Sequence, residues 1–538
     1  FFQAEDGIRD FDTNSDGVLD ANDDNFGQFA VWQDLDQDGV TDDGELSSLS
    51  EASITQIELT TDSDSRDYDG YALHGVGSFT RGGQATKFLD ISLNYSNVGF
   101  RRTADGNVYL RGQDGFEKLF LAEGVAHNYV LEDATVVEVD GGTLNDRISV
   151  NIDTGVLLDG GNGDDVLEGG SGDDWIVGGA GRDVLTGGAG NDVLFVDIDD
   201  IERAQVDGGA GTDIALLVGD EGYDIDLTKI SVKAFWAGAG NDRITFDGTA
   251  DITVDAGDGN DFVQTGDGND VVIGSGGVDR IYTGAGDDIA VVDADDNFAE
   301  IDLGEGYDTL QFSSEAGLTL DLSVFNAEYV VGGSGNDTLG NGTSSKDIRI
   351  EGGLGDDTIT GGAGDDHLFG DVGDDVLDGG AGDDIIIGGL GDDILEGGEG
   401  SDTYLFGLAS GTDLIKNANE SETLDQIAFS TGVAPTRISF KRTGSSLAVR
   451  NNETDHTVSV LGWFASTANR VDYLNFTDYD ETIRILGVIG DDAGQNVTGS
   501  ALYSSLLVGL GGDDTITGDV QDDIIYGGSG ADTIDGGA

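Results

Sequence analysis

The sequence contains no cysteine and a single proline, Pro435, in 538 residues. Without cysteine, no disulfide can hold the fold, so a secreted chain of this kind needs another staple, and a bound metal is the obvious candidate. No apolar run approaches the roughly 18 residues of a membrane-spanning helix, and no N-terminal signal peptide is recognisable. The sequence therefore excludes a disulfide scaffold and predicts no membrane span.

Basic residues are scarce as well. The chain has 24 Lys and Arg against 107 Asp and Glu, a formal net charge of −83. Such an excess excludes nucleic acid as a partner and disfavours an anionic membrane surface unless cations bridge the two. We expect the chain to recruit cations before it can become compact.

Known catalytic motifs are also missing. The sequence has no H-E-x-x-H zinc motif, no G-x-S-x-G elbow and no G-x-x-x-x-G-K-[ST] phosphate loop. Acidic residues are so frequent that no carboxylate pair stands out as a glycosidase site. We therefore predict no enzymatic activity for this chain. The four histidines, expected to be structural or exposed, are His74, His127, His367 and His456.

What the sequence does have is a nine-residue repeat. Residues 352–405 hold six nonapeptides without a gap, and they read GGLGDDTIT, GGAGDDHLF, GDVGDDVLD, GGAGDDIII, GGLGDDILE and GGEGSDTYL. Each follows G-G-x-G-x-D-x-U-x, in which U is a large apolar residue, except for Asp371 in the third. This is the pattern of a calcium-binding parallel β-roll. A disordered acidic linker would explain the composition, but it would not keep an apolar residue in a fixed phase.

Each repeat predicts a turn followed by a short strand. The glycines permit positive φ and close backbone approach, and the apolar residue at position eight is expected to point inward, where stacked repeats bury it. The aspartate at position six is expected to face the neighbouring turn, where backbone carbonyls complete an all-oxygen cage for Ca²⁺. In this central block the position-six ligands are Asp357, Asp366, Asp375, Asp384, Asp393 and Asp402.

Three further blocks repeat the pattern. Residues 160–195 keep it intact, whereas residues 256–291 replace the first glycine with Ala256, Thr265 and Thr283 and are expected to hold weaker or fewer sites. A last block starts at residue 509. Single repeats stand alone in the sequence at 208–216, 237–245, 303–311 and 332–340. The position-six ligands of the three blocks are Asp165, Asp174, Asp183, Asp192, Asp261, Asp270, Asp279, Asp288, Asp514, Asp523 and Asp532.

Two loops near the N-terminus resemble EF-hand calcium loops. Residues 34–45, DLDQDGVTDDGE, match fully, while residues 12–23, DTNSDGVLDAND, carry Asp23 in place of the usual final Glu. Two Asp-Gly surface turns are the simpler alternative. The predicted ligands are Asp12, Asn14, Asp16, the Val18 carbonyl, Asp20, Asp23, Asp34, Asp36, Asp38, the Val40 carbonyl, Asp42 and Glu45.

Two segments depart from the repeat. Residues 61–135 and 406–505 alternate apolar and polar residues between turns, which predicts β-rich units. In the second, RISFKRTGSSLAVR reads as a hairpin with Gly444 in its turn, and TVSVLGWF and RVDYLNFTD read as strands. We expect this segment to cap the roll with its aromatic side chains in a core, although such aromatics also occur on carbohydrate-binding surfaces.

These motifs together resemble the RTX family, the hemolysin-type calcium-binding proteins exported by type I secretion. The resemblance implies an extracellular chain that stays unfolded in the cytosol, passes through the type I secretion machinery and folds on Ca²⁺ outside. It implies a structural or adhesive part of a larger exoprotein, with a cell-surface or polysaccharide partner. An accessory module of an RTX protease, lipase or alginate epimerase, or the repeat region of a pore-forming toxin, are the alternatives.

The predicted fold is mostly β, with β-roll blocks, an EF-hand-like loop pair and β-rich caps. The opening FFQAEDGIRD resembles translated adaptor sequence, so residues 1–10 are expected to be non-native. The predicted order is residues 1–10 adaptor-derived, 11–60 loop pair, 61–135 β-rich unit, 136–204 β-roll, 205–345 irregular β-solenoid, 346–405 β-roll, 406–505 cap and 506–538 truncated β-roll.

Overall fold

The computed structural model describes residues 107–537, apart from 112–116, 122–124, 133, 204, 297, 408–410, 418–423, 435–436, 466–470, 477–480, 485–492, 500–504 and 521–522, and the backbone of strands β1 to β8 before them. The chain forms two compact units. Unit 1 comprises Phe1–Ala215 with Ile230–Val232, and unit 2 comprises Leu216–Lys229 with Lys233–Ala538. None of the helices in the described part is long and apolar enough to cross a membrane.

Unit 1 contains a parallel β-solenoid. Its strands alternate between two sheets, so each 18-residue coil contributes one strand to each, as in the register Leu158↔Ile176 and Leu167↔Leu185. The first sheet contains β10 (Glu117–Phe120), β12 (Val136–Asp140), β14 (Leu157–Asn162), β16 (Trp175–Ala180) and β18 (Val193–Val196). The second contains β11 (Asn128–Leu131), β13 (Arg147–Val150), β15 (Val166–Gly170), β17 (Val184–Ala189) and β19 (Val206–Ala210).

Antiparallel strands precede this solenoid in unit 1. Parallel pairing begins at β10, inside the segment 61–135 that we predicted as a separate β-rich unit. The domain boundaries themselves stay predictions. The earlier strands are β1 (Val18–Asp20), β2 (Ala30–Trp32), β3 (Leu46–Ser48), β4 (Ile54–Glu58), β5 (Arg66–Tyr68), β6 (Tyr71–Arg81), β7 (Gln84–Ser92), β8 (Gly99–Arg102) and β9 (Val108–Arg111).

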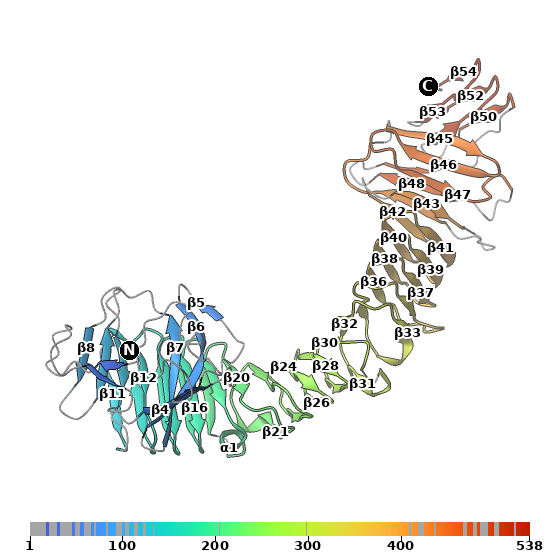
Figure 1. Ribbon diagram of the computed structural model, residues 1–538. Helices are drawn as coiled ribbons and strands as arrows, with labels where there is room; N and C mark the ends of the chain where they lie inside the picture. Colours follow the sequence, from blue (N-terminus) through green and yellow to red (C-terminus); the bar gives the residue numbers. More distant parts are fainter. Residues whose placement is uncertain are drawn as a thin grey trace. The chain divides into compact units, whose positions relative to one another are not determined.

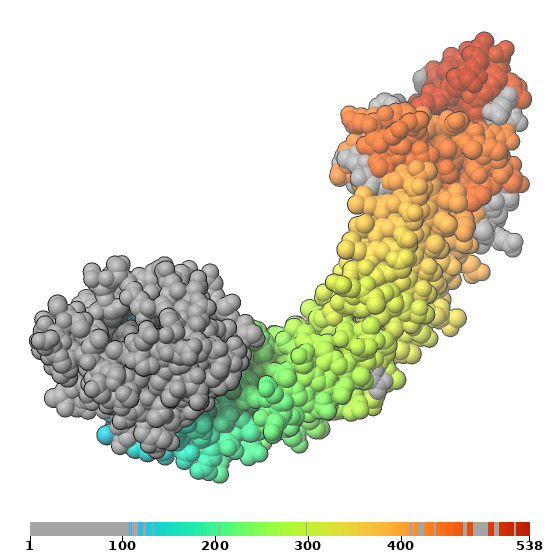
Figure 2. Space-filling view, in the orientation of Figure 1, coloured from blue at the N-terminus to red at the C-terminus, as the bar shows by residue number. Residues whose placement is uncertain are grey.

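Unit 2 continues the same architecture through most of its length. In Figure 1 its strands β36 to β42 lie one above another, and in Figure 2 the colours of this unit follow the sequence order from coil to coil. One sheet contains β22 (Ala234–Trp236), β24 (Thr253–Asp255), β27 (Val271–Ile273), β30 (Ile289–Val292), β32 (Thr309–Phe312), β34 (Tyr329–Val331), β36 (Arg349–Leu354), β38 (His367–Val372), β40 (Ile385–Leu390), β42 (Thr403–Phe406), β44 (Gln426–Phe429) and β48 (Tyr473–Phe476).

The opposite side of unit 2 is divided between two sheets. The first contains β21 (Asp224–Asp226), β23 (Arg243–Thr245), β26 (Phe262–Gln264), β29 (Arg280–Tyr282) and β31 (Ile301–Asp302). The second contains β33 (Thr319–Asp321), β35 (Thr338–Gly340), β37 (Thr358–Gly362), β39 (Val376–Ala381), β41 (Ile394–Glu399), β43 (Thr412–Ile415) and β47 (Thr457–Val460). Short helical turns interrupt the coils at α1 (Ile198–Ile201), η3 (Leu227–Lys229), η4 (Phe298–Glu300) and η5 (Leu322–Val324).

The core of the solenoid is a stack of single apolar side chains. The residue at position eight is fully buried in every repeat of the three complete blocks, from Leu167 to Tyr404. Position seven faces outward, as at the exposed His367. Because a single coil buries its apolar residue only against the coils above and below, stability depends on the stacking of neighbours. The predicted fold class, a mostly β parallel solenoid, is confirmed.

The single repeats that stand alone in the sequence still stack as coils of the solenoid. Ile244 of the repeat 237–245 pairs in register with Ile225 before it and Val263 after it, so the intervening segment forms a coil of its own. The coil needs one inward apolar residue per strand and a turn that closes. A 3₁₀ turn such as η3 closes it without the glycines of the repeat.

The segment after the central block closes the sheets with antiparallel strands. The predicted hairpin is β45 (Ile438–Thr443) and β46 (Ser446–Asn451), with Gly444 at φ 63° between them. Strand β46 runs antiparallel to β47, and β49 (Glu481–Arg484) antiparallel to β48. Strand β47 ends at Val460, so the predicted strand TVSVLGWF is shorter than expected, and Trp463 lies buried in the turns that follow.

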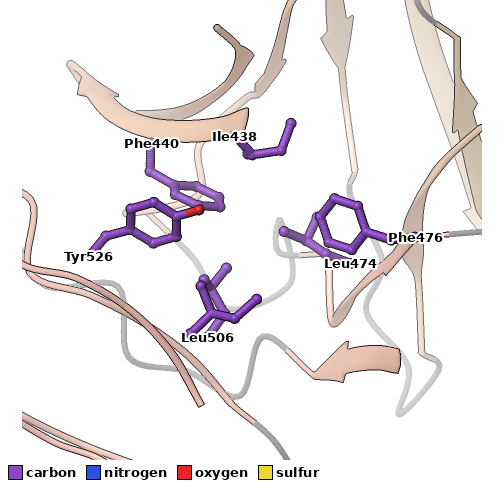
Figure 3. A pocket seen from close by; sticks show the side chains of 7 residues that line it. Ile438, Phe440, Leu474, Phe476, Leu506 and Tyr526 are labelled. Atoms are coloured by element: carbon purple, nitrogen blue, oxygen red, sulfur yellow. The ribbon is translucent and has the colours of Figure 1, made fainter. Parts of the chain in front are cut away.

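A second small roll packs on this segment. Its strands are β50 (Asn496–Thr498), β51 (Leu506–Val508), β52 (Thr515–Thr517), β53 (Ile524–Tyr526) and β54 (Thr533–Asp535). Figure 3 shows the small pocket between this roll and strands β45 and β48. In it, the rings of Phe440 and Tyr526 meet edge-to-face with their centroids 5.3 Å apart. The pocket is lined by Ile438, Phe440, Leu474, Phe476, Leu506, Ile524 and Tyr526. This apolar lining supports a packing role for these aromatics.

The stacked core predicts that one large-to-small change weakens its neighbours. Leu377→Ala removes a fully buried side chain from the middle of the central block, and we expect a loss of about 2–5 kcal/mol. His367→Ala, at an exposed position of the preceding repeat, is the control and should stay within about 0.5 kcal/mol. Urea unfolding of the calcium-loaded chain measures both, and equal losses would contradict the burial argument.

Candidate metal centre

The aspartate at position six is the most buried acidic residue of each repeat. Its exposed fraction is 0–1% throughout the three complete blocks and at Asp514, although an aspartate is rarely buried unless it is paired. Asp523 and Asp532 in the last block are partly buried. The predicted ligands of the β-rolls therefore form rows inside the two turn regions of the solenoid.

A backbone hydrogen bond holds each of these carboxylates. The N–H of Asp366 donates to Oδ1 of Asp384 at 2.8 Å, and the N–H of Asp384 donates to Oδ1 of Asp402 at 3.1 Å. On the other edge, the N–H of Asp357 donates to Oδ1 of Asp375 at 2.7 Å. Each carboxylate thus reaches the equivalent residue of the preceding coil, one turn of the solenoid away. We call these rows the inner ladders.

The inner ladders extend beyond the regular blocks. In unit 1 they join Asp146, Asp165, Asp183 and Asp200 on one edge, and Asp174, Asp192 and Asp213 on the other. In unit 2 they join Asp242, Asp261, Asp279 and Asp296; Asp270, Asp288 and Asp308; Asp337, Asp357, Asp375, Asp393 and Asp413; Asp366, Asp384, Asp402 and Asp425; and Asp514 and Asp532.

In the regular blocks, the second carboxylate oxygen accepts no backbone N–H. Oδ2 of Asp165, Asp375 and Asp384 is buried and makes no hydrogen bond. A buried acceptor without a partner costs free energy, and an uncompensated charge costs more. Among the described residues, no Lys, Arg or His forms an ion pair with the ladder carboxylates from Asp165 to Asp402.

The first glycine of each repeat leaves room for this oxygen. A Cβ added to Gly160 would lie 2.5 Å from Oδ2 of Asp165 and 2.6 Å from the carbonyl oxygen of Gly178 in the next coil. A side chain added at Gly160 would therefore collide with the carboxylate as it is placed in this coil. The carboxylate and the carbonyl of the next coil converge on one space, which we call the cradle.

A second row of carboxylates lies outside the first. Position five is exposed, and its hydrogen bond runs in the opposite direction along the solenoid: the N–H of Asp383 donates to Oδ1 of Asp365 at 2.8 Å, and the N–H of Asp392 to Oδ1 of Asp374 at 2.9 Å. The consecutive N–H groups of positions five and six are thus both satisfied by carboxylates of neighbouring coils.

The protonation of the inner ladder reflects its burial. The pKa of Asp384 is raised from 3.8 to about 7. Desolvation is the largest cause, the backbone N–H of Asp366 opposes it, and the neighbouring carboxylates of Asp402 and Asp366 add to it. Desolvation likewise raises the pKa of Asp165 and Asp375 to about 7. A ladder of ionised carboxylates without a counterion is therefore unfavourable in the folded chain.

A hard divalent cation fits these groups. Each cradle presents a carboxylate oxygen and backbone carbonyl oxygens, such as Oδ2 of Asp165 and the carbonyl of Gly178. Ca²⁺ prefers all-oxygen ligand sets of this kind. Within the described part of the chain, no three acidic or histidine side chains gather around one metal-sized space. Each cradle therefore supplies one carboxylate, and its remaining ligands have to be carbonyls, as the repeat predicted. We propose Oδ2 of the position-six aspartates as the side-chain ligand.

The two predicted EF-hand-like loops lie outside the described residues, apart from the backbone of Val18–Asp20. That backbone pairs antiparallel with β4. The second loop connects β2 to β3, which pair antiparallel through Trp32↔Leu46, so strands stand where an EF-hand has helices. The EF-hand-like part of the predicted fold is not shown, and its ligand assignment stays a prediction.

The structure adds ladder residues that the repeat pattern did not supply as ligands: Asp146, Asp200, Asp213, Asp242, Asp296, Asp308, Asp337, Asp413 and Asp425. Most of them share a weaker signal, an aspartate two residues before a buried apolar residue and 19–23 residues from the neighbouring ladder position. Asp413 before Ile415 and Asp425 before Ile427 show it.

Asp200 and Asp296 are held differently. Each is the last residue of a D-x-D-D motif. Its Oδ2 accepts a hydrogen bond from the backbone N–H of the first aspartate of that motif, at 2.9 Å from Asp197 and 2.7 Å from Asp293. Both carboxylate oxygens are then satisfied by backbone N–H groups. These two turns show that the fold can hold a buried ladder carboxylate with protein groups alone.

The raised pKa values predict how the calcium-free chain responds to pH. Below pH 3.8 the ladder carboxyls are protonated in both the folded and the unfolded chain, so their ionisation does not oppose folding. Between about pH 4 and 7 the same carboxyls ionise in the unfolded chain but resist ionisation in the folded one, so the free energy of unfolding falls as the pH rises. In chelator, β-structure measured by circular dichroism should therefore be greater at pH 4.5 than at pH 8. Millimolar Ca²⁺ should restore it at pH 8. Sedimentation controls for aggregation, and equal folding at both pH values in chelator would contradict this account.

Comparisons with known proteins support the calcium assignment. The family model described as the RTX calcium-binding nonapeptide repeat (4 copies) matches residues 159–194, 255–290, 326–339, 349–377, 369–404 and 508–538. These ranges coincide with coils whose ladders and cradles are described above. A second model, the SPM domain, matches residues 3–94, which include both predicted loops and most of the stretch that we expected to be adaptor-derived.

Individual relatives are more distant. The iron-regulated protein FrpA of Neisseria meningitidis serogroup C is 32% identical over 93 residues, which are 17% of this chain and 8% of that protein. The extracellular lipase LipA of Serratia marcescens aligns over 48% of this chain and 45% of its own, with 20% identity and a TM-score of 0.18.

A calcium-dependent β-helical antifreeze protein from an Antarctic bacterium aligns over 68% of this chain and 96% of its own, with 18% identity and a TM-score of 0.17. The calcium assignment rests on the matched repeats and on the solenoid that they form. The chain contains RTX calcium-binding nonapeptide repeats, and its β-solenoid is consistent with an RTX repeat protein.

Proposed function

We propose that this chain is a calcium-dependent structural region of a secreted protein, which folds when it meets Ca²⁺ outside the cell. The observation that carries the proposal is the inner ladder of the glycine-containing coils, because the buried Oδ2 atoms of Asp165, Asp375 and Asp384 accept no hydrogen bond. A cation that binds the folded coils and not the unfolded chain stabilises the fold by its binding free energy.

The net charge of −83 supports the same cycle. Where free Ca²⁺ is scarce, repulsion between carboxylates keeps the chain expanded, and an expanded chain is suited to passage through the type I secretion machinery. Where Ca²⁺ is millimolar, the ladders are neutralised coil by coil. The finished solenoid is a scaffold of an adhesin or surface protein, with a cell-surface or polysaccharide partner, and it performs no catalysis.

Hydrogen exchange of the full chain tests the proposal. In chelator, peptides that cover residues 352–405 should exchange within seconds, and in millimolar Ca²⁺ they should be protected. Mg²⁺ at the same concentration should protect them poorly, because it demands near-octahedral geometry and keeps its waters. Protection in chelator would remove calcium from the folding reaction, and equal protection by Mg²⁺ would reduce its role to charge screening.

A pair of adjacent substitutions separates coordination from charge. Asp384→Asn and Asp383→Asn each remove one negative charge. Asp384 is buried in the inner ladder, whereas Asp383 is exposed in the second row of carboxylates at position five. We expect Asp384→Asn to raise the Ca²⁺ midpoint of folding about tenfold, equivalent to ~1.4 kcal/mol, and Asp383→Asn to change it less than about twofold. Circular dichroism during Ca²⁺ titration measures both, and equal shifts would show that net charge alone governs folding.

A further inference from the structure

The coils at residues 256–308 fill the cradle with protein atoms. On one edge the position-one residues are Thr265, Thr283 and Leu303 instead of glycine, and all three are buried. They precede the ladder residues Asp270, Asp288 and Asp308, whose Oδ1 hydrogen bonds are the same as in the glycine-containing coils.

The two threonines bond to the group that faces the cradle elsewhere. Oγ1 of Thr265 donates to the carbonyl oxygen of Thr283 at 2.8 Å, and Oγ1 of Thr283 donates to the carbonyl oxygen of Leu303 at 2.7 Å. In the glycine-containing coils, the equivalent carbonyl is that of Gly178, which converges with Oδ2 of Asp165 on the open cradle.

The threonine therefore removes both the space and one backbone ligand that a cation would need. Its methyl and hydroxyl groups occupy the room, and its one hydroxyl proton is committed to the carbonyl that would otherwise be a ligand. Oδ2 of Asp270 and of Asp288 remains buried. The hydroxyl of Thr265 lies close enough to Asp270, and that of Thr283 to Asp288, to lower the pKa of each carboxyl against the rise caused by burial. What distinguishes these coils from the central block is the residue at position one.

We propose that the cradles of Asp270 and Asp288 are dormant calcium sites, closed by Thr265 and Thr283, and that this edge of the solenoid folds without an ion. The threonine hydroxyls connect three successive coils in the ion's place. The segment then serves as a calcium-independent stretch on which calcium-bound coils stack. This inference rests on the proposed function, since it divides the coils into those that need Ca²⁺ and those that do not.

Reopening the cradles tests the inference. In the full chain, Thr265→Gly with Thr283→Gly should bind two more Ca²⁺ ions than the parent at saturation, measured by equilibrium dialysis and metal analysis. The matched control is Thr265→Val with Thr283→Val, which removes the hydroxyls but keeps the volume, and it should gain none. A glycine variant that folds but binds no more Ca²⁺ than the parent would overturn the proposal. A valine variant that binds two fewer Ca²⁺ ions than the parent would also overturn it.

The parent chain supplies a second measurement that does not depend on how the variants fold. In chelator, hydrogen exchange of peptides covering residues 262–291 should be slower than that of peptides covering residues 352–405. Equally fast exchange in both would overturn the calcium-independent edge. If residues 352–405 are themselves protected in chelator, the proposed function fails, whereas the ion count of the glycine variant still reports on the cradles.

Discussion

The structure depends on one contact, in which a buried aspartate accepts the backbone N–H of the equivalent aspartate one coil before. This hydrogen bond fixes the turn, brings each coil into register with the next and places the second carboxylate oxygen beside a backbone carbonyl. The same contact that builds the solenoid therefore collects negative charge inside it. Because burial of an ionised carboxylate is costly, the fold and its need for a cation have the same origin.

Repetition turns this local problem into a property of the whole chain. Each coil touches its neighbours, so the stability of the stack is a sum of coil and interface contributions. The apolar side chain at position eight supplies the attractive part, and the ladder supplies a part that is unfavourable until a cation enters. Two kinds of coil depart from this balance. In the D-x-D-D turns a backbone N–H donates to Oδ2 of the ladder aspartate. In the coils with threonine at position one, the hydroxyl donates to the carbonyl that would otherwise face the cation.

The regular blocks could be predicted from the sequence because each position has one task. Position six supplied the buried carboxylate and position eight the core, so Asp384 and Ile386 were identified from spacing alone. The direction of the Oδ1 hydrogen bond could not be predicted, since it is a contact between residues 18 apart. The core positions of the irregular coils could not be assigned for a related reason: Ile225 and Ile415 occupy the core through backbone register, and turns without glycine carry no recognisable phase.

The most direct test of the central claim is a crystal structure of the chain grown in millimolar Ca²⁺, with anomalous difference maps that identify the cation. Our account predicts anomalous peaks within about 2.3–2.6 Å of Oδ2 of Asp366, Asp375 and Asp384, the range of Ca²⁺–oxygen distances. Peaks confined to the exposed carboxylates of position five, with water or nothing beside these Oδ2 atoms, would contradict it.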